Sequence, residues 1–361
     1  MTPRERSQTA MRGQTPDRVP VVPLIDTSYA AACYGVPVSE CFLDPEVHAR
    51  ALLSCLERHP DIDGLSINIG IAPEVVRERV RTPAGWLVTT LDGSVWQVPL
   101  DDIGTPVRHD ITCFEDVRLQ TLDILRPHVI ETLHHIPADV LARYNISVGL
   151  TGPFSQVGFM MGVQRVLIAM IDQPEELQAA IACRTPFALV WAEQVAALGS
   201  PSVWIGEGMA SGSLISSAHY ASFVLPSEQQ VMRRLRELGV PSALHICGRA
   251  DNLLDEMARS GADCFEIDWQ VDLKVAKSRI GSGVSLKGNL HTSKLAQSTP
   301  AEVYEDSGCA IQATGPGGGF ILSSGCALGR DTPPGNIDAM ARAARDFGVH
   351  SRHQEARARS S

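Results

Sequence analysis

The segment HICG places a histidine and a cysteine two residues apart, at His245 and Cys247. In an extended strand, side chains two residues apart point to the same face, so the imidazole and the thiol would lie side by side. Gly248 follows and lets the chain turn away from the strand. Such a pair can act as a nucleophile with its general base, or as two ligands of one metal ion.

A third soft donor, Cys326, ends the apolar run GGFILSSGC near the C-terminus. In a closed barrel this run would return to the mouth near the strand that carries His245 and Cys247. One imidazole and two thiols suit zinc, and three protein ligands leave a fourth position open for a substrate. The sequence has no C-x-x-C pair of the kind that marks many structural zinc sites. The alternative is that His245 is a core histidine and that both cysteines only pack.

This donor set limits the reaction that a bound zinc ion would support. Two thiolates and a neutral imidazole cancel the double charge of the ion, which makes it a weaker Lewis acid than zinc held by three histidines. A substrate thiol at the open position would be deprotonated and would keep enough electron density to attack an alkyl group. The set therefore favours nucleophilic catalysis by a zinc-bound thiolate over activation of water.

Eight short apolar runs are predicted to be the strands that position these donors. They span residues 19–25, 63–70, 145–152, 202–208, 241–248, 263–269, 284–290 and 319–326. Helical periodicity fills most of the intervals, for instance over 216–239 and 250–261. This alternation indicates an α/β protein with a parallel sheet, closed as a single (β/α)8 TIM barrel.

Both ends of the chain carry local signals. Thr2, Pro3 and Glu5 form a capping-box pattern, which predicts an N-terminal helix. The C-terminal segment is polar and basic. We expect the barrel domain to span residues 1–345 and residues 346–361 to form a disordered tail.

An insertion is expected after the second strand. The runs GWLVTT and SVWQVP flank Asp92 and Gly93, and an Asp-Gly pair is a strong β-hairpin signal. Two helices are predicted to follow, around 115–125 and 128–142. Such an insertion could form a lid or a wall of the site, or a scaffold or dimer contact.

Other polar residues also stand at the predicted C-terminal ends of strands, where barrel enzymes carry their functional groups. They are Asp26, Asn68, Thr151, Glu207, Asp268 and Asn289. Among these we predict catalytic roles for Glu207, Asp268 and Asn289. Glu207 could be an exchangeable zinc ligand, a base beside the metal, or the ion-pair partner of Arg249. Asp268 and Asn289 could position a substrate, or could only hydrogen-bond the end of the barrel.

Composition narrows the class of partner and the compartment. The 361 residues include 31 basic and 41 acidic side chains, a net charge of −10, which disfavours nucleic acid and anionic membranes as partners. There is neither an apolar stretch long enough for a membrane helix nor a secretory signal, so we expect a cytoplasmic protein. The nine cysteines are scattered and odd in number, which disfavours a disulfide framework. Five of them are expected to be buried structural thiols: Cys33, Cys55, Cys113, Cys183 and Cys264.

The glycine run over residues 315–320 precedes a strand and lacks the helix N-terminus of a phosphate-binding loop. We interpret it as a tight turn at the bottom of the barrel.

Two long segments carry a resemblance to a known family. They run HICGRADNLLDEMARSGADCFEIDWQVDLKVAKSRIGSGVSLKGNL and GGFILSSGCALGRDTPPGNIDAM, and they resemble the uroporphyrinogen decarboxylase superfamily. They look most like its branch of methylcobamide:coenzyme M methyltransferases. The resemblance implies a β/α barrel, with zinc bound by the His-x-Cys pair and the distant cysteine, here His245, Cys247 and Cys326. It also implies a methylcobalamin or other corrinoid co-substrate, carried on a separate protein.

Parts of the chain depart from both branches. Decarboxylases resemble one another in an arginine-rich loop after the first strand, whereas PLIDTSYAAACYG contains no arginine. Decarboxylation of a tetrapyrrole is therefore disfavoured. The segments GNLHTS, with His291, and GEGMAS also differ from the methyltransferase pattern. Both line the mouth in that family, which puts coenzyme M in doubt as the thiol.

The leading hypothesis is a zinc-dependent methyltransferase linked to a corrinoid. A zinc-bound thiol would take the methyl group from a methyl-corrinoid, or a methoxy or methylamine substrate would be demethylated onto the corrinoid. Asp268 and Asn289 would then position substrate or corrinoid. The alternatives are a corrinoid-independent zinc-thiolate transferase or C–S lyase, and a tetrapyrrole binder without catalysis. The expected partners are a small thiol or methylated substrate and a separate corrinoid protein, and a homodimer stays open.

Overall fold

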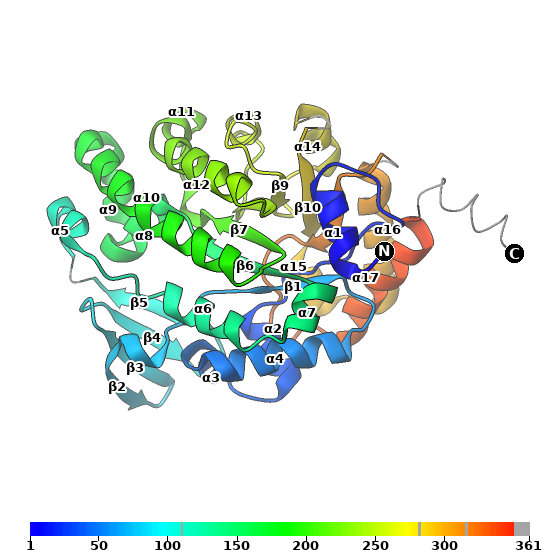
Figure 1. Cartoon of the computed structure of the whole chain (residues 1–361), viewed down its shortest axis with the longest axis horizontal. Coiled ribbons are helices and arrows are strands. Elements are labelled where there is room, and N and C mark those ends of the chain that lie inside the picture. Colours follow the sequence, from blue (N-terminus) through cyan, green and yellow to red (C-terminus); the bar gives the residue numbers. More distant parts are fainter. Residues whose placement is uncertain (110, 281–282, 315–316, 350–361) are drawn as a thin grey trace, which may run out of the picture.

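Seven parallel strands form the curled sheet at the centre of the protein (Figure 1). The computed structural model describes residues 1–109, 111–280, 283–314 and 317–349. In sheet order the strands are β1 (Gly64–Ile67), β6 (Asn145–Thr151), β7 (Ser202–Gly206), β8 (Ser242–Ile246), β9 (Cys264–Ile267), β10 (Ser285–Leu290) and β11 (Phe320–Ser324). The predicted α/β barrel architecture is confirmed.

The segment 19–25 lies between the two edge strands of this sheet and closes it. On one side the Val22 N–H donates to the Leu322 carbonyl oxygen of β11, at 3.0 Å. On the other side the Ser66 N–H of β1 donates to the Ile25 carbonyl oxygen, at 3.1 Å. The eighth position of the barrel is therefore occupied by a residue run that hydrogen-bonds to both neighbours.

This closing segment is not the regular strand that its apolar pattern predicted. It forms only an isolated bridge, Val21 with Leu322. Pro20 and Pro23 interrupt it, and proline has no N–H to donate to a ladder. The position of the predicted first strand was right, and its regular hydrogen bonding was wrong.

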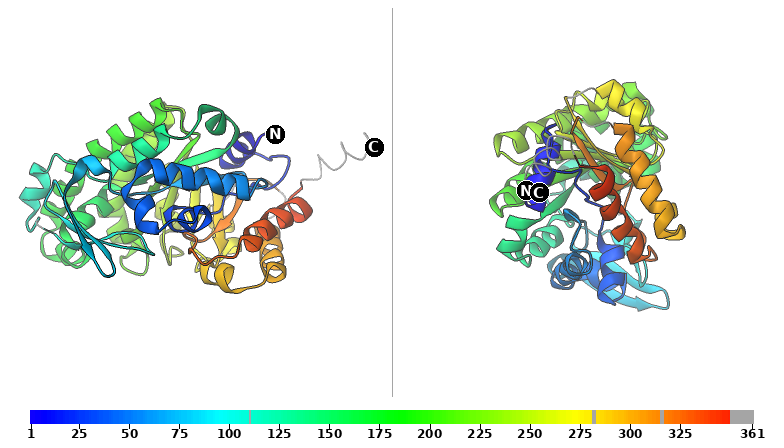
Figure 2. Two further views of the ribbon diagram at one scale, coloured as in Figure 1. Left: turned by 90° about the horizontal axis from the view of Figure 1, so that it is seen from below. Right: turned by 90° about the vertical axis from the view of Figure 1, so that its right-hand side faces the viewer.

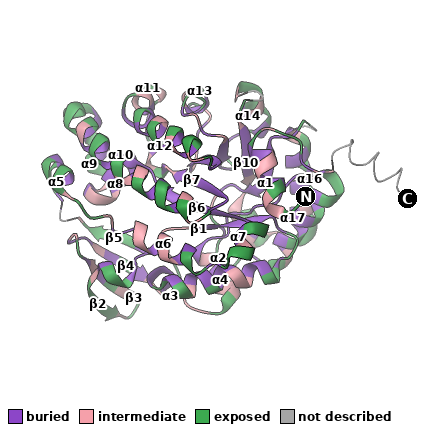
Figure 3. Cartoon of the chain, in the orientation of Figure 1, coloured by how far each residue is buried: buried purple, intermediate pink, exposed green. Residues whose placement is uncertain are grey.

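Helices surround the barrel and bury their apolar faces on the sheet, so that most residues of the barrel strands are buried (Figure 3). The α-helices are α1 (Pro3–Met11), α2 (Thr27–Tyr34), α3 (Val38–Leu43), α4 (Pro45–Arg58), α5 (Phe114–Leu119), α6 (Arg126–His134), α7 (Ala138–Arg143), α8 (Pro153–Met161), α9 (Val163–Asp172), α10 (Pro174–Ala197), α11 (Ser217–His219), α12 (Leu225–Glu237), α13 (Leu254–Met257), α14 (Leu273–Ile280), α15 (Thr292–Gln297), α16 (Pro300–Thr314) and α17 (Pro334–Phe347). Short 3-10 turns lie at Pro73–Val75 and Gly208–Ala210, and a π-helical turn lies at Tyr220–Val224.

Several predicted helices are shorter or more divided than expected. The helix predicted over 216–239 is α11, the π-helical turn and α12, and the one over 250–261 contains only the four-residue α13. Three helices, α5, α6 and α7, replace the two predicted over 115–142, because Pro137 stands directly before α7 and separates it from α6. Within the described part of the chain no single helix is long and apolar enough to span a membrane. The bent pair α8–α9, taken together, has the necessary length and apolar composition.

The insertion after β1 forms a second, antiparallel sheet in the order β2 (Val76–Thr82), β3 (Gly85–Thr90), β4 (Val95–Pro99) and β5 (Thr105–Arg108). The predicted hairpin is β3–β4, with Gly93 at φ +89°. The flanking strands β2 and β5 were not predicted, since β2 is charged and largely exposed. The sheet lies at the opposite end of the molecule from α17 (Figure 2).

The N-terminal helix α1 covers the end of the barrel opposite the mouth. Its predicted capping box between Thr2 and Glu5 is present. Ala10 and Met11 pack on the starts of the strands, and the Ser285 hydroxyl donates to the carbonyl oxygens of both. At the other terminus α17 runs to Phe347, two residues beyond the predicted domain boundary, and most of the predicted tail, residues 350–361, lies outside the described residues.

Candidate metal centre

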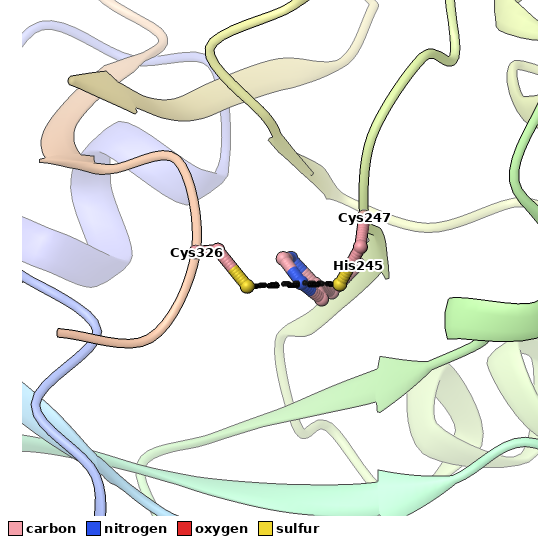
Figure 4. A group of neighbouring side chains, drawn as sticks. All are labelled: His245, Cys247 and Cys326. Atoms are coloured by element: carbon pink, nitrogen blue, oxygen red, sulfur yellow. Dashed lines mark hydrogen bonds between the residues drawn. The ribbon is translucent and has the colours of Figure 1, made fainter. Parts of the chain in front are cut away.

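The structure brings the three soft donors together at the mouth of the barrel (Figure 4). His245 Nε2 lies 3.0 Å from Cys247 Sγ and 4.0 Å from Cys326 Sγ, and the two sulfur atoms are 3.7 Å apart. The three ligand atoms all lie within 4.8 Å of one another. The hydrogen bond between the thiols lowers the pKa of Cys247 and raises that of Cys326.

Local features of the chain aim these side chains at one point. His245 is the fourth residue of β8, and Cys247 follows one residue after the strand ends, as the predicted spacing requires. Gly248 turns the chain with φ +72°, and its N–H donates to Asp268 Oδ2 at 2.7 Å. Gly325 lies against the backbone after β9, where an added Cβ would approach the Trp269 nitrogen at 2.6 Å. Only a glycine lets the loop that carries Cys326 come so close.

Behind the imidazole lies an ion pair that the sequence interpretation missed. His245 Nδ1 faces Glu266 Oε2 at 3.7 Å, and Glu266 Oε1 accepts a hydrogen bond from Lys287 Nζ at 2.6 Å. The three residues sit at paired positions of β8, β9 and β10 and are all buried. The available signal was a charged residue inside each of two runs predicted to be barrel strands, because such charges are buried only when they are paired.

Glu207 is buried at the end of β7, but its carboxylate points to the start of α8. It accepts hydrogen bonds from the Phe154 N–H, the Ser155 N–H and the Ser155 hydroxyl, at 3.2, 2.9 and 2.6 Å. Burial raises the pKa of Glu207 to about 7, against the opposing effect of these hydrogen bonds. The suggested ion pair with Arg249 is wrong, because Arg249 instead pairs with Asp251 on the surface.

Asp268 and Asn289 hold the loops of the mouth. Asp268 accepts the Gly248 N–H, and its other oxygen, Oδ1, is buried without a hydrogen-bond partner. Asn289 Nδ2 donates to the carbonyl oxygens of Asp268 and Val271, at 3.2 and 2.6 Å. These contacts give both residues a structural part in shaping the mouth, and their catalytic roles stay predictions.

A cavity of about 380 Å³ opens beside the three donors. Its wall is mostly apolar and includes Phe159, Trp204 and Met209. The polar side chains of the wall, besides the donors, are Asp26, Ser66, Asn68, Thr151 and Ser155. Ile103, from the insertion, also lines it, so this insertion contributes a side chain to the cavity wall. A larger hollow of about 750 Å³ lies along α9 and contains none of the three donors.

The cysteines outside the cluster differ in burial. Cys55 and Cys264 are buried as predicted, and Cys33 is partly buried. Cys113 and Cys183 are exposed, because both lie on outward-facing positions. The prediction that they are buried was therefore wrong. All nine thiols are free. The spacing and odd number of the cysteines had disfavoured a disulfide framework.

Comparison with known proteins places the chain in a family. The chain is 33% identical over 236 residues to a methylated-thiol–coenzyme M methyltransferase of Methanosarcina mazei, and the matched region covers 62% of each protein. It is 25% identical to the methylcobamide:CoM methyltransferase MtbA of the same organism, over 96% of this chain and 98% of that one. A uroporphyrinogen decarboxylase of Nocardia farcinica is also 25% identical, over 92% of this chain and 93% of that protein.

Solved structures agree on the fold. A methyltransferase from Methanosarcina mazei superposes with a TM-score of 0.82 at 21% identity, over 96% of this chain and 99% of that one. The family model described as uroporphyrinogen decarboxylase (URO-D) matches residues 92–347, more than two thirds of the chain. On this evidence the protein belongs to the uroporphyrinogen decarboxylase (URO-D) family.

Proposed function

We propose that this protein is a zinc-dependent methyltransferase that moves a methyl group between a corrinoid, carried by a separate protein, and a thiol. The observation that carries the proposal is the meeting of one imidazole and two thiols within 4.8 Å beside an apolar cavity. The names of the methyltransferase relatives support methyl transfer, and the word methylcobamide in one of them supports the corrinoid.

The residues present fit a zinc ion. His245, Cys247 and Cys326 would hold it through one nitrogen and two sulfur atoms, the soft donors that zinc prefers. His245 Nδ1 is buried without a hydrogen-bond partner and faces the Glu266 carboxylate, as in sites where a carboxylate orients a metal-binding histidine. When bound, zinc would lower the pKa of a substrate thiol so that its sulfur is a nucleophile at neutral pH.

The residues of the chain prepare this reaction in two ways. Glu266 would accept the Nδ1 proton of His245, which fixes the tautomer that presents Nε2 to the metal. The apolar wall of Phe159, Trp204 and Met209 keeps water away from the sulfur. In the proposed transfer, the substrate sulfur would form the bond to the methyl carbon while the carbon–cobalt bond of the corrinoid breaks. Both electrons of that bond would stay with cobalt, and the thiol proton would leave to solvent.

Decarboxylation, for which the family is named, is less compatible with this cavity. A porphyrinogen carries many carboxylates, which need cationic partners. No lysine or arginine lines the cavity in the described part of the chain.

Metal analysis of purified protein tests the proposal. We expect about one zinc ion per chain in the wild type and loss of stoichiometric zinc in Cys326→Ala. Cys183→Ala, which removes an exposed cysteine, is the matched control and should keep its zinc. The wild type should also consume methylcobalamin only when a thiol is added. Full zinc content in Cys326→Ala would refute the ligand assignment, and thiol turnover without methylcobalamin would favour the corrinoid-independent alternative.

A further inference from the structure

The charge of the cavity wall is unusual for a site that would bind an anionic thiol. Apart from the three proposed metal ligands, Asp26 is the only ionisable side chain on the wall within the described residues. Coenzyme M, which appears in the names of the relatives, carries a sulfonate. A sulfonate needs cationic or hydrogen-bond-donating partners, and this wall offers a carboxylate instead.

Asp26 stands at the end of the closing segment and is buried. Its Oδ1 accepts the Ser28 N–H at 3.2 Å as the N-cap of α2, and its Oδ2 accepts Asn68 Nδ2 at 3.2 Å. None of the ion pairs found among the described residues includes Asp26. Burial raises the pKa of this carboxyl to about 6, and the nearby Asp102 raises it further. When it is ionised, the Asp26 carboxylate therefore has no cationic group beside it, in the described part of the chain, to balance its charge.

Ser66 provides a second, independent sign of a missing ligand group. It lies on β1, two residues before Asn68, and lines the same cavity. Its hydroxyl oxygen is buried and has no hydrogen-bond partner. Buried hydroxyl groups are nearly always hydrogen-bonded, so the unpaired oxygen of this cavity-lining residue could accept or donate a hydrogen bond to a group bound beside it.

We infer that Asp26, together with Ser66, selects the polar end of the substrate, and that this end is a cationic or neutral hydrogen-bond donor, an ammonium or a hydroxyl, instead of a sulfonate. This inference rests on the proposed transfer of a methyl group to a thiol. The donor group would bond to Asp26 and Ser66 Oγ while the sulfur lies at His245, Cys247 and Cys326. Asp26 is thus a specificity-determining residue.

Three thiols of matched length test the inference: 2-aminoethanethiol, 2-mercaptoethanol and 2-mercaptoethanesulfonate. Binding is measured on the Co(II)-substituted protein from the sulfur-to-cobalt charge-transfer absorption, which needs no corrinoid and no turnover. We expect 2-aminoethanethiol to bind about 10- to 100-fold more tightly than the sulfonate, the range of one hydrogen bond to a charged group. The hydroxyl compound should lie between them.

Asp26→Asn should bring the affinities for the amine and the sulfonate to within about threefold of each other, since it removes the charge. Asparagine also caps helices, so α2 should remain folded. Asp44→Asn is the matched control, because Asp44 caps α4 through the Glu46 and Val47 N–H groups and does not line the cavity. It should keep the wild-type preference.

The outcomes separate this inference from the proposed function. If none of the thiols produces the absorption band, thiol binding at the metal fails and both proposals fall. If all three bind with similar affinity, if the sulfonate binds best, or if Asp26→Asn keeps the wild-type preference, the inference alone is overturned.

Discussion

His245 and Glu266 sit at paired positions of β8 and β9, with His245 Nδ1 and Glu266 Oε2 3.7 Å apart inside the barrel. Neither atom has a hydrogen-bond partner, although both are buried. A small movement of the ring, such as coordination of Nε2 would favour, would bring the two atoms into hydrogen-bonding distance. We therefore expect metal binding at His245 to strengthen the contact between His245 and Glu266.

Replacement of Glu266 should weaken metal binding. We expect Glu266→Gln to lower zinc affinity by about 10- to 100-fold, measured by competition with a chromophoric chelator. It should also destabilise the protein, because Lys287 would keep a buried charge without a counter-ion.

The double variant Glu266→Gln/Lys287→Met separates these two effects. It should recover much of the stability, measured by urea denaturation, while zinc affinity stays low. Glu193→Gln, at an exposed carboxylate paired with Arg234, is the control. Wild-type zinc affinity in Glu266→Gln would show that the carboxylate does not orient His245.

We expect Glu207 to contribute mainly to the stability of the folded protein. In Glu207→Ala the Phe154 and Ser155 N–H groups at the start of α8 lose their shared acceptor. Loss of such buried contacts costs about 1–3 kcal/mol of unfolding free energy, which denaturant titration can measure. Zinc content should stay at the wild-type level, because three other donors remain. Complete loss of zinc from the folded variant would make Glu207 an indispensable ligand and would contradict this expectation.

The buried pair His48 and His128 should make the protein less stable in acid. Burial lowers the pKa of His48 to about 3 and holds that of His128 well below its usual value. Below pH about 6.5 the unfolded chain therefore binds protons that the folded chain does not, and stability falls by about 1.4 kcal/mol per pH unit for each histidine.

The contribution of this pair can be isolated in a double variant, His48→Asn/His128→Gln. These amides keep donor and acceptor groups near the interacting ring nitrogens, His48 Nδ1 and His128 Nε2, which are 3.1 Å apart. Between pH 7 and pH 5, the unfolding free energy of the wild type should fall more steeply than that of the variant. A difference independent of pH would show that the pair does not titrate on unfolding.

The cavity wall depends on a glycine. An added Cβ at Gly149 would lie 2.6 Å from the ring of Trp204, which packs edge-on against His245. Gly149→Ala should thus displace this ring, cost about 1–3 kcal/mol of stability and weaken thiol binding in the Co(II) assay. Gly329→Ala, where a Cβ meets open space, should leave stability unchanged. Unaltered thiol affinity in Gly149→Ala would mean that Trp204 does not shape the cavity.

Much of the architecture was predictable because it follows from local rules. Apolar runs of strand length separated by helical periodicity indicated the barrel, and Asp92 with Gly93 indicated the β3–β4 hairpin. These signals depend on a few neighbouring residues. The predictions failed where a local feature competes with the pattern, as where Pro20 and Pro23 interrupt the closing segment.

The sequence by itself determined that the side chains of His245 and Cys247, two residues apart at the end of an extended segment, point to the same side, because alternation along an extended backbone is a property of the chain alone. Only the tertiary structure decided what those side chains meet. That Cys326 reaches them, that Glu266 lies between His245 and Lys287, and that Glu207 turns to α8 depend on the register of neighbouring strands and on which loops close over them. Register is set by the packing of the whole barrel, so no single strand carries that information.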